Sequence, residues 1–241
     1  MKQLFVALAL LASISGFSQW SWKKVEGSGN LKKETRTVGN YTAISSSGAW
    51  DVMVAYGESN NIEIEGDDNL LPLIETVVEN GKLSIKSKNV NIHSRNKITV
   101  YVSLTKVTGL SLSGSGDIIG DGKFGNDGTT EFKTSGSGRI RFTFGKISNV
   151  YVRVSGSGHI KLTGSANSVE TSISGSGGAD CRNLIADDAN IRISGSGNAQ
   201  VYANKKVSAS ISGSGSASYR GAASDVSKHI SGSGRLSKAG D

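Results

Sequence analysis

Apolar side chains fall at every second position through much of residues 139–219. The runs 150–154 and 160–162 show the pattern on either side of a short Gly-rich interruption, with polar or charged residues in between. A period of two is typical of β-strands that have one dry face and one face in water. No apolar stripe of 3.6-residue period and useful length is present, which argues against helical and leucine-rich repeats. The pattern predicts an all-β protein.

The tetrapeptide Ser-Gly-Ser-Gly occurs seven times, at intervals of 22, 20, 19, 20, 18 and 19 residues. The copies begin at Ser113, Ser135, Ser155, Ser174, Ser194, Ser212 and Ser231. A fixed period near 20 residues indicates a solenoid. Such a repeat is too short for two helices but long enough for short strands and turns. We therefore predict a parallel β-helix whose coils stack about 4.8 Å apart.

The tetrapeptide itself suits the corner of such a coil. If the alternation continues through it, both glycines face the interior and both serines face water. Glycine at a corner lets the backbone bend and approach the neighbouring coil closely. The only cysteine, Cys181, falls at an interior position. It is expected to be a small buried hydrophobic residue, with a reactive or intermolecular thiol as the alternative.

The segment before the repeats remains strand-like but lacks the tetrapeptide. Its Asn80-Gly81 pair is the strongest short signal for a β-hairpin. We expect one β-helix domain over 38–236, with an irregular N-terminal part over 38–110 and the Ser-Gly-Ser-Gly coils over 111–236. Residues 19–37 mix Lys and Glu around a Gly-Ser-Gly and are expected to form a flexible leader.

Residues 1–18 have the features of a secretory signal peptide. A short positive start is followed by an apolar run from Leu4 to Ile14 and by small residues before Gln19. The run is shorter than the roughly 20 residues that span a bilayer, and we expect no transmembrane segment in the mature chain. The prediction is an exported protein in the periplasm, at the cell surface or outside the cell. Export argues against nucleic acid as a partner.

Composition narrows the class further. Of 241 residues, 32 are Gly and only one is Pro, which disfavours both collagen and a Pro-rich linker. The formal net charge of +7 permits anionic partners without naming one.

Basic residues gather at outward positions of the coils around residue 150. Arg139 and Arg141 should lie beside His159 and Lys161 of the next coil, with Arg153 nearby. Such a ridge could attract acidic glycans or other anionic surface polymers. The alternative is a solubilising surface, since these charges are not interleaved with exposed aromatic residues.

No catalytic residue, cofactor or metal site is expected. Residues 120–125 match G-x-G-x-x-G, but a turn follows instead of the helix that a dinucleotide site needs. Asp does not recur after the tetrapeptides, and the three histidines fall in different registers, which argues against calcium and zinc sites. Asp180, Asp187 and Asp188 are the best local carboxylates for a pectinase-like polysaccharide-degrading enzyme. A general acid, a general base and a group that orients them do not occur together there, so this function is kept as the alternative.

Three further features resemble a known family. They are the repeated Ile-Ser-Gly-Ser-Gly blocks, the Ser-Gly-Ala-Trp-Asp-Val of residues 47–52, and the Asn-Leu-Leu of 69–71 followed by Asn-Gly-Lys-Leu-Ser-Ile at 80–85. Over residues 38–236 the chain resembles the "putative auto-transporter adhesin, head GIN domain" family of exported bacterial proteins. The resemblance implies a right-handed β-helix and a protein of the cell envelope or surface. The expected function is that of a non-catalytic adhesin or scaffold that binds a cell-surface glycan or an envelope protein.

Overall fold

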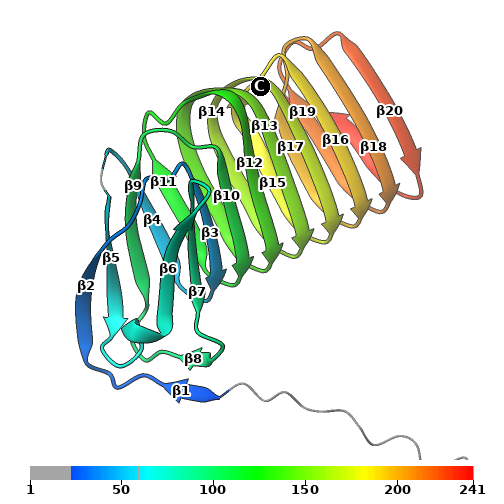
Figure 1. The fold of residues 1–241 in the computed structure, drawn as a ribbon. Helices are drawn as coiled ribbons and strands as arrows, with labels where there is room; N and C mark the ends of the chain where they lie inside the picture. The colour runs from blue at the N-terminus through cyan, green and yellow to red at the C-terminus, as the bar shows by residue number, and fades with distance from the viewer. Residues whose placement is uncertain (1–22, 59, 241) are drawn as a thin grey trace, which may run out of the picture.

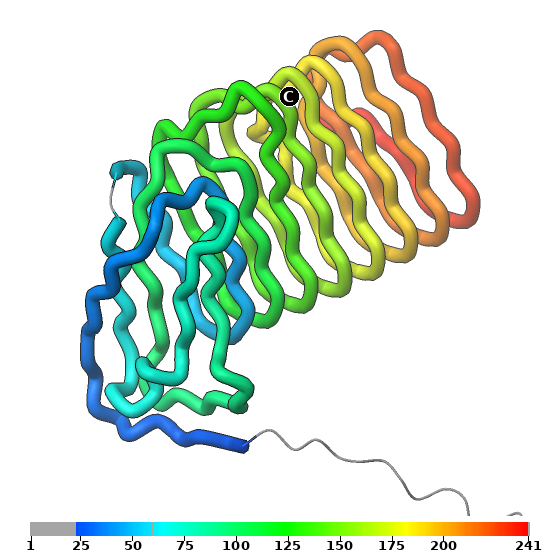
Figure 2. Tube along the Cα trace, viewed as in Figure 1, coloured from blue at the N-terminus to red at the C-terminus, as the bar shows by residue number. Residues whose placement is uncertain are grey.

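The computed structural model describes residues 23–58 and 60–240, which form an all-β, right-handed β-solenoid (Figure 1). Parallel strands make two walls, and each coil of the repeat section contributes one strand to each wall. Figure 2 shows the coils stacked along one axis, with the irregular N-terminal part at one end and the last coil at the other. The expected fold class is confirmed. The predicted signal peptide, residues 1–18, lies outside the described residues.

Wall 1 holds the strands that lead into the Ser-Gly-Ser-Gly corners, and wall 2 holds the strands that follow them. Wall 1 consists of β3 (Ala43–Gly48), β10 (Gly109–Gly114), β12 (Asn126–Gly136), β16 (Asp188–Gly195), β18 (Lys206–Gly213) and β20 (Asp225–Ser231). Wall 2 consists of β4 (Asp51–Tyr56), β11 (Asp117–Asp121), β15 (Gly178–Ile185), β17 (Asn198–Tyr202), β19 (Ser216–Arg220) and β21 (Arg235–Lys238). The long strands β13 (Arg139–Gly156) and β14 (His159–Gly175) begin in wall 2 and end in wall 1.

The residues at the inward positions fill the bore of the solenoid. Val150, Val152 and Val154 are at most 2% exposed, and the same positions of the next three coils are also buried. The widest side chains lie in the first repeat coils, where the rings of Phe124 and Phe142 have centroids 4.6 Å apart. The predicted alternation is therefore confirmed, because burial of these side chains removes apolar surface from water.

Each Ser-Gly-Ser-Gly corner needs its glycines for two different reasons. The first glycine of each copy has φ between +97° and +125°, a conformation that L side chains rarely adopt. A Cβ there would lie 2.3–3.0 Å from the carbonyl oxygen of the preceding coil. The second glycine faces the core and both serines are exposed, as predicted, but the first glycine is exposed or half-exposed. The prediction that both glycines face the interior is wrong for the first, because its positive φ breaks the strand alternation. In the coil of β3 and β4, Trp50 takes the place of the second glycine and is 3% exposed.

The N-terminal part doubles back before the regular coils begin. After β4 the chain runs through β5 (Asn61–Asp67), a 3-10 turn (Leu71–Leu73), the hairpin of β6 (Ile74–Glu79) and β7 (Lys82–Ser87), and β9 (Thr99–Leu104). Both Asn80 and Gly81 have positive φ, so the predicted hairpin is confirmed. Strands β7 and β9 pair with the outer edges of β3 and β4, so they extend walls 1 and 2, whereas β10 and β11 pair with the inner edges.

The described part of the expected flexible leader is ordered into strands. Residues 23–37 carry β1 (Lys24–Glu26), which pairs with β8 (Asn91–His93), and β2 (Leu31–Thr37), which pairs antiparallel with β5. The Arg36 guanidinium donates hydrogen bonds to the carbonyl oxygens of Ile74 at 2.6 Å and Leu71 at 2.8 Å. The expectation is corrected, because polar side chains at exposed positions hid a strand that backbone pairing holds in place.

Asp67 links two loops of this N-terminal part through hydrogen bonds. Its buried carboxylate accepts hydrogen bonds from the backbone N–H groups of Gly29, Arg95 and Asn96 and from the Asn96 amide, at 2.7–3.2 Å. Burial opposes the charge, but these donors hold the pKa of Asp67 below its usual value. The ionised carboxylate therefore fastens the turn before β2 to the loop before β9.

Candidate basic groove on wall 2

Four of the five predicted ridge residues lie together on the outer surface of wall 2. The parallel register of β13 and β14 places Arg139 beside His159 and Arg141 beside Lys161. All four side chains are exposed. They come together because their strands belong to successive coils, whose neighbouring strands are about 4.8 Å apart.

Arg153 does not belong to this group. It lies in the second half of β13, where it pairs with Lys133 of β12 and Ser172 of β14 in wall 1. Its guanidinium makes an ion pair with Glu131 at 2.7 Å. The prediction for Arg153 is therefore wrong, because the corner after Phe144 carries the chain to the opposite wall.

Asp117 positions the two arginines. Its carboxylate oxygens lie 3.1 Å from Arg139 Nε and 3.3 Å from Arg141 Nη2, and its side chain is only 9% exposed. His159 and Lys161 make no ion pair with any residue in the described part of the chain. The cluster thus keeps an excess of positive charge, and its guanidinium groups retain N–H donors for an anion.

A shallow groove runs along wall 2 across successive strands. It consists of three connected hollows of about 680, 230 and 470 Å³. The first and second share Ile119, Gly120 and Asp121, and the second and third share Arg141 and Lys161. In the third hollow Gly178 occupies an outward position without a side chain, beside the His159 imidazole.

The carboxylates considered for hydrolysis either pair with cations or lie outside the groove. Asp180 Oδ1 lies 2.8 Å from Arg182 Nε, and Asp187 Oδ2 lies 2.9 Å from Lys205 Nζ. The hydrogen bond to Asp187 raises the pKa of Lys205. Asp188 is exposed at the start of β16 and is not among the residues that line the groove. These contacts match charged surface pairs, whereas glycoside hydrolysis needs two carboxyl groups facing one substrate.

The cysteine has no access to the groove. Cys181 is fully buried at the inward position that the alternation predicted. Burial raises the pKa of its thiol to about 12, so the reactive thiolate is not formed near neutral pH.

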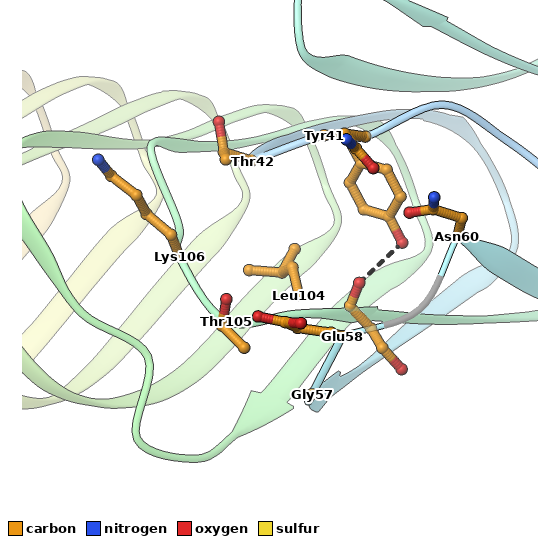
Figure 3. Close-up of a pocket in the computed structure, with 10 residues that line it drawn as sticks. Tyr41, Thr42, Gly57, Glu58, Asn60, Leu104, Thr105 and Lys106 are labelled. Atoms are coloured by element: carbon orange, nitrogen blue, oxygen red, sulfur yellow. Dashed lines mark hydrogen bonds between the residues drawn. The ribbon is translucent and has the colours of Figure 1, made fainter.

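A separate cavity of about 530 Å³, outside the groove, lies where the ends of β4 and β9 meet the start of β3 (Figure 3). In Figure 3 Lys106 stands at one side of the cavity and Asn60 at the other. The Tyr41 hydroxyl donates a hydrogen bond to the Ser103 carbonyl at 3.0 Å, and burial raises its pKa. The phenol is therefore occupied by the protein's own backbone.

The sequence reasoning missed the apolar end of the wall 2 groove. Met53, Tyr101 and Ile119 lie at outward positions of β4, β9 and β11 and line the largest hollow. Each one follows a buried aliphatic residue on its strand. The sequence signal was an apolar residue at a position where the alternation expects a polar, outward-facing one, and it occurs in all three strand segments.

These features define a right-handed β-solenoid with a basic and partly apolar groove on one wall. The model of the family described as "Putative auto-transporter adhesin, head GIN domain" matches residues 40–223. The chain belongs to this family. No curated protein is significantly similar to it in sequence.

Solved structures share the fold over nearly the whole chain. A "putative adhesin" from Bacteroides fragilis NCTC 9343 has a TM-score of 0.82 and 21% identity, covering 89% of this chain and 100% of its own. A "putative lipid binding protein" from Parabacteroides distasonis ATCC 8503 has a TM-score of 0.72 and 24% identity, covering 90% and 100%. A "putative adhesin" from Parabacteroides merdae ATCC 43184 has a TM-score of 0.69 and 22% identity, covering 90% and 100%. At these identities the likeness extends to the fold alone.

Proposed function

We propose that the protein is an exported, non-catalytic adhesin of the cell envelope or surface, and that its wall 2 groove binds an anionic glycan. Membership of an adhesin family supports the binding role. One observation supports the site most strongly. Arg141 and Lys161 lie side by side in adjacent coils where two hollows of the groove meet, and Lys161 makes no ion pair within the described residues.

The groove suits an extended polymer with repeated negative charges. It crosses the strands, so successive coils present side chains to successive units of a chain lying along it. Guanidinium groups bind carboxylates in a planar, two-pronged geometry, and the lysine adds a mobile point charge. The outward amides of Asn198 and Gln200 line the far end of the groove and offer donors and acceptors for sugar hydroxyls.

Export is proposed from the sequence of residues 1–18. No helix in the described residues is long and apolar enough to cross a membrane. Protease treatment of intact cells, followed by detection of the chain, would distinguish a surface location from a periplasmic one.

The function is tested by calorimetric titration of the purified chain with polygalacturonate, using dextran as the neutral polymer. We expect binding of polygalacturonate that weakens as salt rises, and no binding of dextran. Replacing Arg141 and Lys161 together by Ala should weaken binding at least about tenfold, since two charge-assisted contacts are lost.

The matched control is Lys133→Ala combined with Arg153→Ala. Both residues are exposed cations on wall 1, so the control lowers the net charge by two, as the test variant does, but leaves the groove intact. Equal weakening by the control would mean that binding follows net charge and that the groove is not the site. Absence of polygalacturonate binding would overturn the proposal of an anionic glycan as ligand.

A further inference from the structure

We infer that the ligand of the wall 2 groove is an anionic glycolipid, whose charged sugar lies on Arg141 and Lys161 and whose alkyl chain lies over Ile119, Met53 and Tyr101. This inference rests on the proposed function and adds the amphiphilic character of the ligand. It follows from the division of one groove into a basic part and an apolar part.

The apolar part is formed by three adjoining strands. Tyr101 of β9 pairs in register with Met53 of β4, and Met53 pairs with Ile119 of β11. All three side chains point outward, where most of the regular coils carry Ser, Asn, Gln or charged residues. Tyr101 is exposed, and Met53 and Ile119 are half-buried, so together they give this end of the groove a partly accessible apolar lining.

The aromatic ring of this part is held in a fixed position. Lys33 Nζ lies 5.3 Å from the centroid of the Tyr101 ring, and the Tyr101 hydroxyl is 3.4 Å from Glu65 Oε2. A fixed ring loses little conformational freedom when a ligand binds. Tyr101 is nevertheless 39% exposed, so part of its side chain remains accessible to a ligand.

The apolar and basic parts are directly connected. Ile119 pairs in register with Arg141, and Arg141 pairs with Lys161. One hollow of about 230 Å³ is lined by all three residues. From Tyr101 to Lys161 the row crosses four strand spacings, about 19 Å, which is the scale of a single-headed amphiphile.

Asp121 marks the boundary between the two parts. It lines both hollows that meet at Ile119 and is exposed. Its carboxylate repels an anionic head group and can accept hydrogen bonds from sugar hydroxyls. For a small carboxylated sugar, loss of this charge should tighten binding.

The inference is tested by calorimetric titration with alkyl β-D-glucuronides, each kept below the concentration at which it forms micelles. The series runs from the methyl to the octyl compound, and octyl β-D-glucoside is the uncharged analogue. We expect the octyl glucuronide to bind at least about tenfold more tightly than the methyl glucuronide, because buried methylenes add affinity. The octyl glucoside should bind more weakly than the octyl glucuronide, and Asp121→Asn should tighten glucuronide binding.

Variants separate the two parts of the groove. Ile119→Ser combined with Met53→Ser should remove the gain from the octyl chain, so that the octyl and methyl glucuronides bind with similar affinity. The control Val77→Ser replaces a 42% exposed residue of β6 outside the groove and should leave the ratio of the two affinities unchanged.

The outcomes distinguish the two proposals. If polygalacturonate binds but lengthening the alkyl chain gives no gain, the glycolipid inference is overturned and the glycan proposal stands. If the octyl glucuronide and the octyl glucoside bind equally, the charged head is not recognised and the inference also fails. If neither polygalacturonate nor any glucuronide binds, both proposals fail, and a protein partner becomes the occupant to seek.

Discussion

At the scale of single residues, the bore of the solenoid contains one polar atom that does not fit its surroundings. Thr171 Oγ1 is the one buried side-chain nitrogen or oxygen of the described residues that lacks a hydrogen-bond partner. Its neighbours in register are Val152 and Ile191, both buried. Burying a hydroxyl without a partner costs free energy, because its bonds to water are lost and not replaced.

Thr171→Val should therefore stabilise the protein. Valine keeps the shape of threonine and removes the unpaired hydroxyl, so the free energy of unfolding should rise by about 1 kcal/mol. Denaturation by urea, followed by circular dichroism, measures the change. Thr130→Val is the control, because Thr130 Oγ1 donates to the Val107 carbonyl at 2.7 Å. That substitution should destabilise by about 1–3 kcal/mol, and a loss of stability in both variants would contradict the interpretation of Thr171.

The burial of single side chains could be predicted from parity alone. Cys181 and Val201 face the bore because each lies on the apolar phase of a strand. Arg153 could not be placed in this way. Parity tells whether a side chain faces in or out, but not on which of two walls its strand lies.

At the scale of elements, the corner is the unit that fixes the coil. The first glycine of each tetrapeptide combines a positive φ with a close approach to the coil below it. The serines beside it are exposed, so the fold itself does not require their identity. The fold therefore depends on the glycines of the repeat.

Gly195→Ala should destabilise the protein by about 2 kcal/mol or more. Its φ is +117°, and a Cβ would lie 2.7 Å from the Gly175 carbonyl oxygen, so strain and a backbone clash add together. Thermal unfolding measures the effect. Ser196→Ala, at the next position and exposed, should change stability by less than about 0.5 kcal/mol. Similar effects of the two substitutions would show that the glycine conformation is not the limiting feature.

The sequence was sufficient to predict the repeat coils but not the N-terminal part. The coils follow from a local period that every copy repeats. The order β7, β3, β10 across wall 1 places strands distant in the chain side by side, and no local pattern encodes it. Strand β2 was missed for a related reason, since its residues are mostly polar and it is held by backbone pairing with β5.

The candidate site shows the same limit. The basic half was predictable because Arg139, Arg141, His159 and Lys161 lie in consecutive repeats of known spacing. The apolar half joins β4, β9 and β11, and Met53 is 48 residues from Tyr101, from the difference of their numbers. Because β9 stacks outside β4, only the doubled-back topology brings these side chains into one groove.

At the scale of the whole molecule, the two ends of the solenoid differ in whether other strands cover them. At the N-terminal end, the antiparallel strands β2 and β6 lie outside the parallel coils. At the C-terminal end, β20 and β21 pair with the preceding coil on one side, and no described strand covers the other. Open strand edges of this kind promote pairing with other chains unless charges oppose it.

We expect Lys228 to oppose such pairing. It takes the inward position that Ala209 occupies one coil earlier, and it is exposed. Its neighbours Val226, 41% exposed, and Ile230 would otherwise form a continuous apolar end. An ammonium group at this point makes stacking of two such ends costly, because each lysine would be buried against apolar side chains or another cation.

Lys228→Ile should therefore cause self-association that increases with protein concentration. The substitution completes the apolar row of β20, so the open ends of two copies can bury it together. Sedimentation velocity at several concentrations measures the association against the unchanged chain. Lys133→Ile adds the same side chain to the outer surface of wall 1 and should have little effect. If Lys228→Ile sediments like the unchanged chain, the lysine is not what prevents association of the C-terminal ends. The remaining exposed charges of the last coil are then sufficient to prevent it.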